Sequence, residues 1–229
     1  MCKAVVLLSG GIDSATALYV AAQTHEHIVA VGIDYNQNHS RELVAARQIA
    51  QQAGVEFQVR SVPQMPASAL TDGSHSSQVP DVTYREIEGQ SPSYVPFRNG
   101  LLISIAAGVA EEYQASSVYV GAHAEDRAGW AYADCSPGFV GAMSAAVLIG
   151  TYNRVSLRAP FLEMEKHEII KWGVKMGTPF ELSYSCYRGG ELHCGKCPTC
   201  YARQEAFARA KITDPTSYQT ASPSNQRGE

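Results

Sequence analysis

The N-terminal segment constrains the fold of this 229-residue chain more than any other feature. Residues Ala4 to Leu8 form a short, continuous apolar run, which predicts a buried strand. The hexapeptide Ser9-Gly10-Gly11-Ile12-Asp13-Ser14 follows directly, and the apolar spacing from Ser14 to Gln23 predicts a helix. A buried strand that passes through a glycine turn into a helix is typical of α/β proteins with a parallel sheet.

Strands and helices alternate along the rest of the chain. Further strands are expected at Ile28–Ile33, Val55–Val59, Ser117–Gly121 and Leu157–Pro160, and further helices at Arg41–Ala53, Gly100–Tyr113, Phe139–Ile149, Glu165–Met176 and Pro198–Lys211. This order predicts an α/β fold with a doubly wound, mostly parallel sheet and right-handed crossovers. Residues 63–95 carry many turn formers and no sustained period, which is typical of a functional or mobile connection.

We expect three parts along the chain: an α/β domain at residues 1–180, a helical metal-binding segment at 181–212 packed on it, and a flexible polar tail at 213–229. The formal net charge of -4 gives no overall electrostatic reason to expect a nucleic-acid partner. No run approaches the roughly 18 apolar residues of a membrane span, and Ser9 interrupts the N-terminal apolar run too early for a secretory leader. We therefore expect a cytoplasmic protein with small-molecule substrates.

The hexapeptide has the composition of a phosphate-binding loop. Its two glycines allow a tight turn with bare N–H groups, and the following helix N-terminus adds partial positive charge. The hydroxyls of Ser9 and Ser14 can donate to the same anion, whereas the Gly-Lys-Ser/Thr ending of a Walker A loop is absent. Asp13 either helps to place Mg²⁺ or caps the helix. The alternative to a phosphate site is a plain strand-to-helix turn with Ser14 as its cap.

Four of the six cysteines lie within fifteen positions: Cys186, Cys194, Cys197 and Cys200. In a reducing compartment such a cluster favours a metal over disulfides, and four thiolates fill the tetrahedral coordination that Zn²⁺ prefers. No position stays open for a substrate, so we expect one structural zinc ion per chain, with His193 as a bystander. An iron–sulfur cluster is the alternative, because it also takes four cysteines.

The sequence resembles two nested groups of proteins. The motif Ser-Gly-Gly-x-Asp-Ser resembles the pyrophosphate-binding loop of PP-loop ATP pyrophosphatases. With further motifs, the chain from about Cys2 to Arg209 resembles the 7-cyano-7-deazaguanine synthase family. These motifs are Leu8–Ser14, Asp34-Tyr35-Asn36-Gln37-Asn38-His39, Val95-Pro96-Phe97-Arg98-Asn99, Tyr132–Phe139, Ser185-Cys186-Tyr187 and the remaining cysteines.

The resemblance implies an ATP-dependent ligase of queuosine biosynthesis that forms a C–N bond, acts as a homodimer, and uses ATP, Mg²⁺ and zinc. ATP would activate 7-carboxy-7-deazaguanine as an adenylate, ammonia would displace AMP to give an amide, and a second activation would dehydrate the amide to the nitrile. The expected nucleotide-binding residues are Leu8, Ser9, Gly10, Gly11, Ile12, Asp13, Ser14 and Arg98, and the expected catalytic residues are Asp13, Arg98 and Lys166.

Several of these assignments compete with simpler interpretations. Arg98 suits phosphate or carboxylate binding because a guanidinium binds both in a fork, and Asn99 is expected to cap the helix that follows. Lys166 either approaches the ATP phosphates or is a solvated lysine at a helix start. Asp134 is expected to accept N–H bonds from the guanine-like edge, or else to form a turn.

The remaining substrate assignments are Tyr132 and His39. Tyr132 is expected to stack on the base. His39, with Tyr35, borders the pocket or lies on the surface.

Three residues depart from the family pattern in the presumed substrate loop, since Ala133, Ser136 and Gly138 stand where the family has Pro, Arg and Glu. Losing two charged residues there motivates an alternative enzyme, which passes the adenylated deazaguanine carboxylate to another amine and stops at an amide or a protein conjugate. A zinc-dependent nucleotide- or tRNA-binding module without catalysis is a third interpretation. A tRNA-thiolating enzyme, which would need Cys2 or Cys135 as a catalytic thiol, is a fourth.

Overall fold

The computed structural model describes residues 3–37, 41–62, 65, 68–71, 79–87, 89–125 and 132–219. Its centre is a five-stranded sheet in the order β3-β2-β1-β4-β5, in which all neighbouring strands pair in parallel. The strands are β1 (Lys3–Leu7), β2 (His27–Asp34), β3 (Glu56–Ser61), β4 (Ser117–Tyr119) and β5 (Ser156–Arg158). The predicted doubly wound parallel sheet is confirmed.

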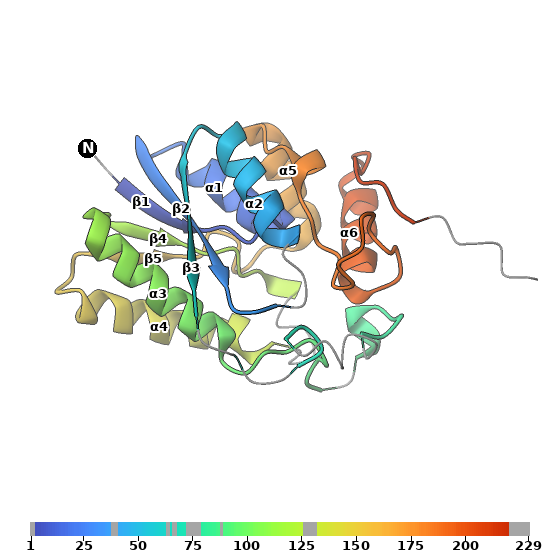
Figure 1. The fold of residues 1–229 in the computed structure, drawn as a ribbon, viewed down its shortest axis with the longest axis horizontal. Helices are drawn as coiled ribbons and strands as arrows, with labels where there is room; N and C mark the ends of the chain where they lie inside the picture. The colour runs from blue at the N-terminus through green and yellow to red at the C-terminus, as the bar shows by residue number, and fades with distance from the viewer. Residues whose placement is uncertain are drawn as a thin grey trace, which may run out of the picture.

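Helices cover both faces of the sheet. They are α1 (Ile12–Ala21), α2 (Arg41–Gln52), α3 (Arg98–Tyr113), α4 (Pro137–Gly150), α5 (Lys166–Met176) and α6 (Pro198–Ala210). Figure 1 shows α1, α2 and α5 on one side of the sheet, α3 and α4 on the other, and α6 at one end of the molecule. Each expected helix is present, with its ends shifted by at most two residues.

Strand β1 explains why the strands read as continuous apolar runs. Ala4 and Val6 belong to the core shared with α1, α2, α5 and α6, whereas Val5 points into the core shared with α3 and α4. Successive side chains of a strand alternate between faces, so a sheet covered on both faces needs apolar residues at every position. Ala206 and Phe207 of α6 lie in the first of these cores, which joins the C-terminal helix to the α/β body.

The strand order reverses between β1 and β4. The chain continues from β1 to β2 on one side, whereas β4 and β5 lie on the other side of β1, so the strand order reverses at this point. In open α/β sheets the crevice beyond the carboxyl ends of the strands at such a reversal is the usual ligand site. The loops after β1 and β4 approach closely here: a Cβ on Gly121, after β4, would lie 3.0 Å from the Asp13 carbonyl carbon and from the Ser14 nitrogen.

Residues 63–95, predicted to be an irregular connection, contain one short 3₁₀ helix, η2 (Tyr84–Glu86), and no strand or α-helix among their described residues. No helix in the described part of the chain is long and apolar enough to cross a membrane. The division at residues 180 and 212 stays a prediction.

Candidate functional site

A cavity of about 280 Å³ lies at the carboxyl ends of the strands. Residues that the sequence singled out line much of it: Leu8, Ser9, Gly11, Ile12, Asp13, Ser14, Arg98, Tyr132, Asp134 and Lys166. Gly10 shapes the loop without lining the cavity. His39 lies outside the described residues, so its predicted place beside the pocket stays a prediction.

The loop after β1 leaves the N-terminus of α1 open. Gly11 is the residue before the first helical position, in an extended conformation and with no side-chain cap. The Ser14 hydroxyl lies 3.0 Å from the Ser9 hydroxyl and donates to the Gly11 carbonyl. Ser14 is thus the third residue of the helix, and the capping role considered for it was wrong. Uncapped N–H groups at a helix start form a ready anion site.

Gly10 fixes the shape of this loop. Its φ of +90° lies in the left-handed region, which other residues rarely adopt. A Cβ at this position would also lie 2.4 Å from the Glu42 carbonyl oxygen. The loop therefore packs directly against the first turn of α2.

Asp13 forms an ion pair across the cavity wall. Lys166 Nζ donates to its Oδ2 at 2.7 Å, and His123 Nε2 lies 3.6 Å from the same oxygen. Burial raises the pKa of Asp13, but Lys166 and His123 outweigh it, and the net pKa is below the ordinary value. The side chain of Lys166 is 14% exposed, so the alternative of a solvated lysine was wrong. Asp13 is the second residue of α1, after the N-cap Gly11, so the alternative that Asp13 caps the helix was also wrong.

Arg98 brings a second cation to the cavity from α3. It is the first residue of that helix, and its Nη1 donates to the Tyr35 hydroxyl at 3.1 Å. Its guanidinium also lies over the Tyr35 ring, 5.6 Å from the centroid. Tyr35 directly follows β2 and also lines the cavity. Arg98, Asp13 and Lys166, which come from the starts of three different helices, therefore surround the same cavity.

Asp134 and Asn99 hold the other end of the cavity. Asn99 was predicted to cap α3, but it lies inside the helix, and Phe97 precedes the first turn with a φ of +55°. The carboxylate of Asp134 supplies the cap instead, because its Oδ2 accepts from the Asn99 backbone N–H at 2.9 Å. The Asn99 amide nitrogen also donates to the Asp134 carbonyl and to the Cys135 sulfur.

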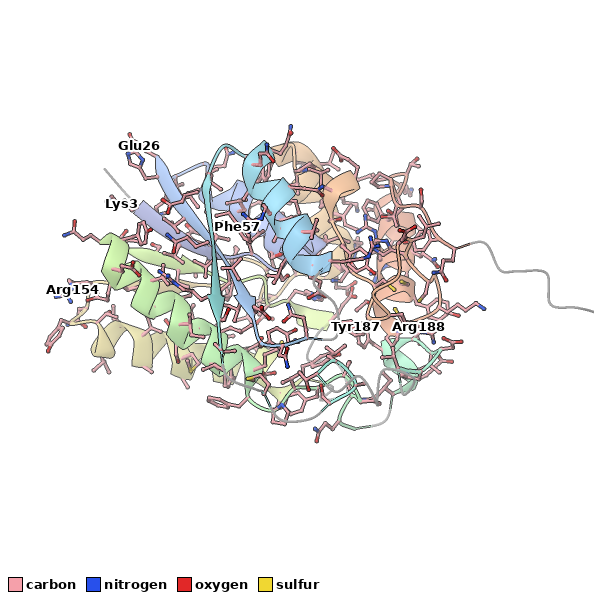
Figure 2. The ribbon with its side chains drawn as sticks, in the orientation of Figure 1. Lys3, Glu26, Phe57, Arg154, Tyr187 and Arg188 are labelled. Atoms are coloured by element: carbon pink, nitrogen blue, oxygen red, sulfur yellow. The ribbon has the colours of Figure 1, made fainter. Side chains whose placement is uncertain are left out.

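A group of hydroxyls to which the sequence assigned no role surrounds Tyr132. Its OH lies 2.6 Å from Ser93 Oγ and 3.3 Å from the OH of Tyr187, which in turn lies 3.0 Å from the OH of Tyr84. Figure 2 shows Tyr187 and Arg188 next to α6 at the end of the molecule opposite Lys3 and Arg154. Tyr132 is therefore bound by its hydroxyl to the 79–95 connection, a role that no local sequence period could indicate.

The three departures from the family pattern do not face the cavity. Ser136 is the N-cap of α4 and accepts from the Phe139 N–H, while Ala133 and Gly138 are exposed. The cavity is lined instead by the intervening Asp134 and Cys135. These substitutions therefore change the start of α4 more than the lining of the site.

The four predicted cysteine ligands meet at the start of α6. Their sulfur atoms all lie within 4.8 Å of one another, and Cys194 Sγ is 3.9 Å from Cys200 Sγ. A tetrahedral zinc site with bonds of about 2.3 Å separates its sulfur atoms by about 3.8 Å, so this geometry fits a metal ion. Hydrogen bonds from Cys186 and Cys200 lower the pKa of Cys197, which favours its thiolate. His193 lies outside the group, and its Nε2 accepts from the Ser185 N–H.

This fold and site define an α/β protein of the PP-loop fold with a cluster of four cysteines whose geometry fits a metal ion. NMN synthetase from Francisella tularensis has the same fold, with a TM-score of 0.50 and 16% identity over 93% of this chain and 78% of its own. The chain belongs to the family described as queuosine biosynthesis protein QueC, whose sequence model matches residues 3–211.

Relatives named 7-cyano-7-deazaguanine synthase are 41% identical in Agrobacterium fabrum and 38% identical in Thermoplasma acidophilum, in each case over 95% of this chain and 92% of the relative. The resemblance inferred from the motifs is confirmed.

Proposed function

We propose that this protein converts 7-carboxy-7-deazaguanine and ammonia into 7-cyano-7-deazaguanine, with ATP activating first the carboxylate and then the amide. The relatives of this name cover nearly the whole chain. The observation that carries the proposal is the uncapped N-terminus of α1, which opens into the same cavity as Arg98 and Lys166. ATP cleavage between the α and β phosphates needs this positive potential where pyrophosphate leaves. The reaction would make the protein a ligase that forms a C–N bond.

In this proposal Leu8 to Ser14 hold the departing phosphates, and Lys166 and Arg98 balance the charge that develops on them. Asp13 suits Mg²⁺, because its Oδ1 is buried and has no hydrogen-bond partner among the described residues. When bound, Mg²⁺ would neutralise phosphate charge. Water is kept from the acyl adenylate by the walls that Tyr184, Tyr187 and α6 contribute.

The deazaguanine base is proposed to lie between Tyr132 and Asp134. Asp134 is buried and held by the start of α3, so its carboxylate is already oriented when a guanine-like edge arrives. Tyr132 is fixed through its hydroxyl and offers its ring. The proposal that another amine accepts the carboxylate is not favoured, because the substitutions behind it lie away from the cavity lining.

The cysteine centre is proposed to hold one structural zinc ion, since four sulfur donors leave no open coordination position. Cytoplasmic conditions, which we also propose, would keep these thiols reduced. A homodimer is supported by α4: it carries no charged residue, and Leu148 and Ile149 are exposed on it. An uncharged, self-complementary face can pair across a two-fold axis without desolvating charge.

The test follows the nucleobase and the adenine nucleotides together by mass spectrometry, with ATP, Mg²⁺, ammonium and 7-carboxy-7-deazaguanine. We expect the nitrile to appear with AMP and pyrophosphate. Accumulation of the adenylate or the amide without nitrile would show that the proposed function is wrong and would direct the search to a different amine acceptor.

A further inference from the structure

The cavity contains an acidic side chain that the phosphate chemistry does not use. Glu42 lies in the first turn of α2 and lines the cavity with Asp13 and Arg98. Its backbone is held against the phosphate loop, because any Cβ on Gly10 would overlap its carbonyl oxygen. The position of Glu42 is thus coupled to the loop that is proposed to bind ATP.

The surroundings of Glu42 differ from those of Asp13. Asp13 has Lys166 at 2.7 Å, whereas the carboxylate of Glu42 has no hydrogen bond or ion pair within the described part of the chain. The charged and titratable groups nearest to it are Arg98 of α3 and Tyr35 after β2. Burial raises the pKa of Glu42 to about 7, although Arg98 opposes this shift. Two carboxylates whose environments separate their pKa values are typical of a site that divides electrostatic and proton-transfer roles.

Amide formation needs a proton acceptor. When ammonia attacks the acyl adenylate, its lone pair forms the C–N bond and the nitrogen becomes positively charged. The nitrogen must lose a proton before AMP leaves with the electron pair of the acyl C–O bond. A partly exposed carboxylate in the cavity wall that is ionised near neutral pH can take this proton, whereas Asp13 is engaged with Lys166.

We propose that Glu42 is the general base of the amine step, accepting the proton from the attacking nitrogen and passing it to water. This inference rests on the proposed function. It concerns only the step after adenylation, so the two halves of the reaction can be measured separately.

The test compares wild type with Glu42→Gln. Adenylation is followed by carboxylate-dependent exchange of labelled pyrophosphate into ATP, and amide formation by single turnover after adding ammonium. We expect exchange within about threefold of wild type and amide formation slower by about 100-fold or more. Glu42→Asp should recover part of the loss. The matched control is Glu191→Gln, which removes a carboxylate that is 90% exposed beside Arg41 near the start of the same helix.

The pH dependence gives a second readout that needs no variant. At a fixed concentration of free ammonia, the single-turnover rate of wild type should rise as pH passes through about 7, where Glu42 loses its proton, and the residual rate of Glu42→Gln should lack this rise. Amide formation at the wild-type rate, equal loss of exchange, or a wild-type rate without this rise would overturn the role of Glu42. Absence of exchange in wild type would instead contradict the proposed function.

Discussion

At the scale of single residues, the pair of Asp13 and Lys166 joins parts of the chain that are 153 positions apart. Lys166→Met should destabilise the fold by about 2 kcal/mol, because Asp13 loses a charged hydrogen bond in a mostly buried place. In a double-mutant cycle with Asp13→Asn, measured by urea unfolding, the two losses should not add. The coupling should be present above the ordinary pKa of an aspartate, about 3.9, and be lost as pH falls through the lower pKa of folded Asp13. Fully additive losses of unfolding free energy at pH 7 would contradict the predicted coupling between Asp13 and Lys166.

Gly10 supports a second prediction at this scale, with Gly54 as its matched control. Both have a positive φ, but nothing lies within 4 Å of a Cβ built on Gly54. Gly54→Ala should therefore cost about 1 kcal/mol of unfolding free energy, the backbone term alone. Gly10→Ala should cost about 3 kcal/mol or more, because the methyl also meets the backbone of α2. Equal losses in thermal or urea unfolding would show that the loop relaxes away from α2.

The sequence predicted those site residues whose spacing is local. The cysteines and the glycine loop are short-range patterns, and both occur where expected. The Asp13–Lys166 pair and the hydroxyls around Tyr132 join distant segments, so no local spacing encodes them. Glu42 was missed because an acidic residue in the first turn of a helix is ordinary for a solvent-exposed helix start.

At the scale of elements, the helix starts also show that contacts between distant segments cannot be predicted from local sequence. Sequence reasoning located α3 but assigned its cap to Asn99, because Asn is a preferred capping residue. The structure supplies that cap from Asp134 of another segment, and Phe97 accepts a left-handed conformation at the junction. Ser136 of α4, by contrast, is a local cap. A cap that comes from elsewhere in the fold cannot be predicted until the segments are placed.

Helix α4 supports a prediction about assembly. Leu148→Glu with Ile149→Glu should convert the proposed dimer to a monomer, because two like charges per subunit would face their copies across the interface. The control is Val174→Glu on α5, which also adds a charge at an exposed apolar residue, 49% exposed, on a different helix. Sedimentation velocity should show the change for the α4 variant only. A wild-type monomer, or a dimer in both variants, would remove α4 as the interface.

At the scale of the whole molecule, alternation of strands and helices predicted the parallel sheet but not its strand order. The reversal between β1 and β4 depends on which connections cross which face, and apolar patterns do not encode that choice. This order brings the loop after β1, the start of α3 and the start of α5 around one cavity. The cysteine cluster belongs to the same arrangement, because Thr199, Ala202 and Arg203 of α6 line the cavity.

Metal removal should therefore affect both stability and nucleotide binding. Arg203 is almost fully buried, pairs with Asp214, and donates to the Ser183 hydroxyl and the Phe180 carbonyl, so it ties α6 to the residues that follow α5. Without the metal, no ion would hold the four sulfur atoms together, and this wall would loosen. We expect one zinc ion per chain by elemental analysis, and after chelation a Tm lower by about 10 °C together with weaker ATP binding in calorimetry. Restored zinc should recover both, whereas a chelated protein with unchanged Tm and ATP affinity would show that the metal does not hold α6 against the cavity.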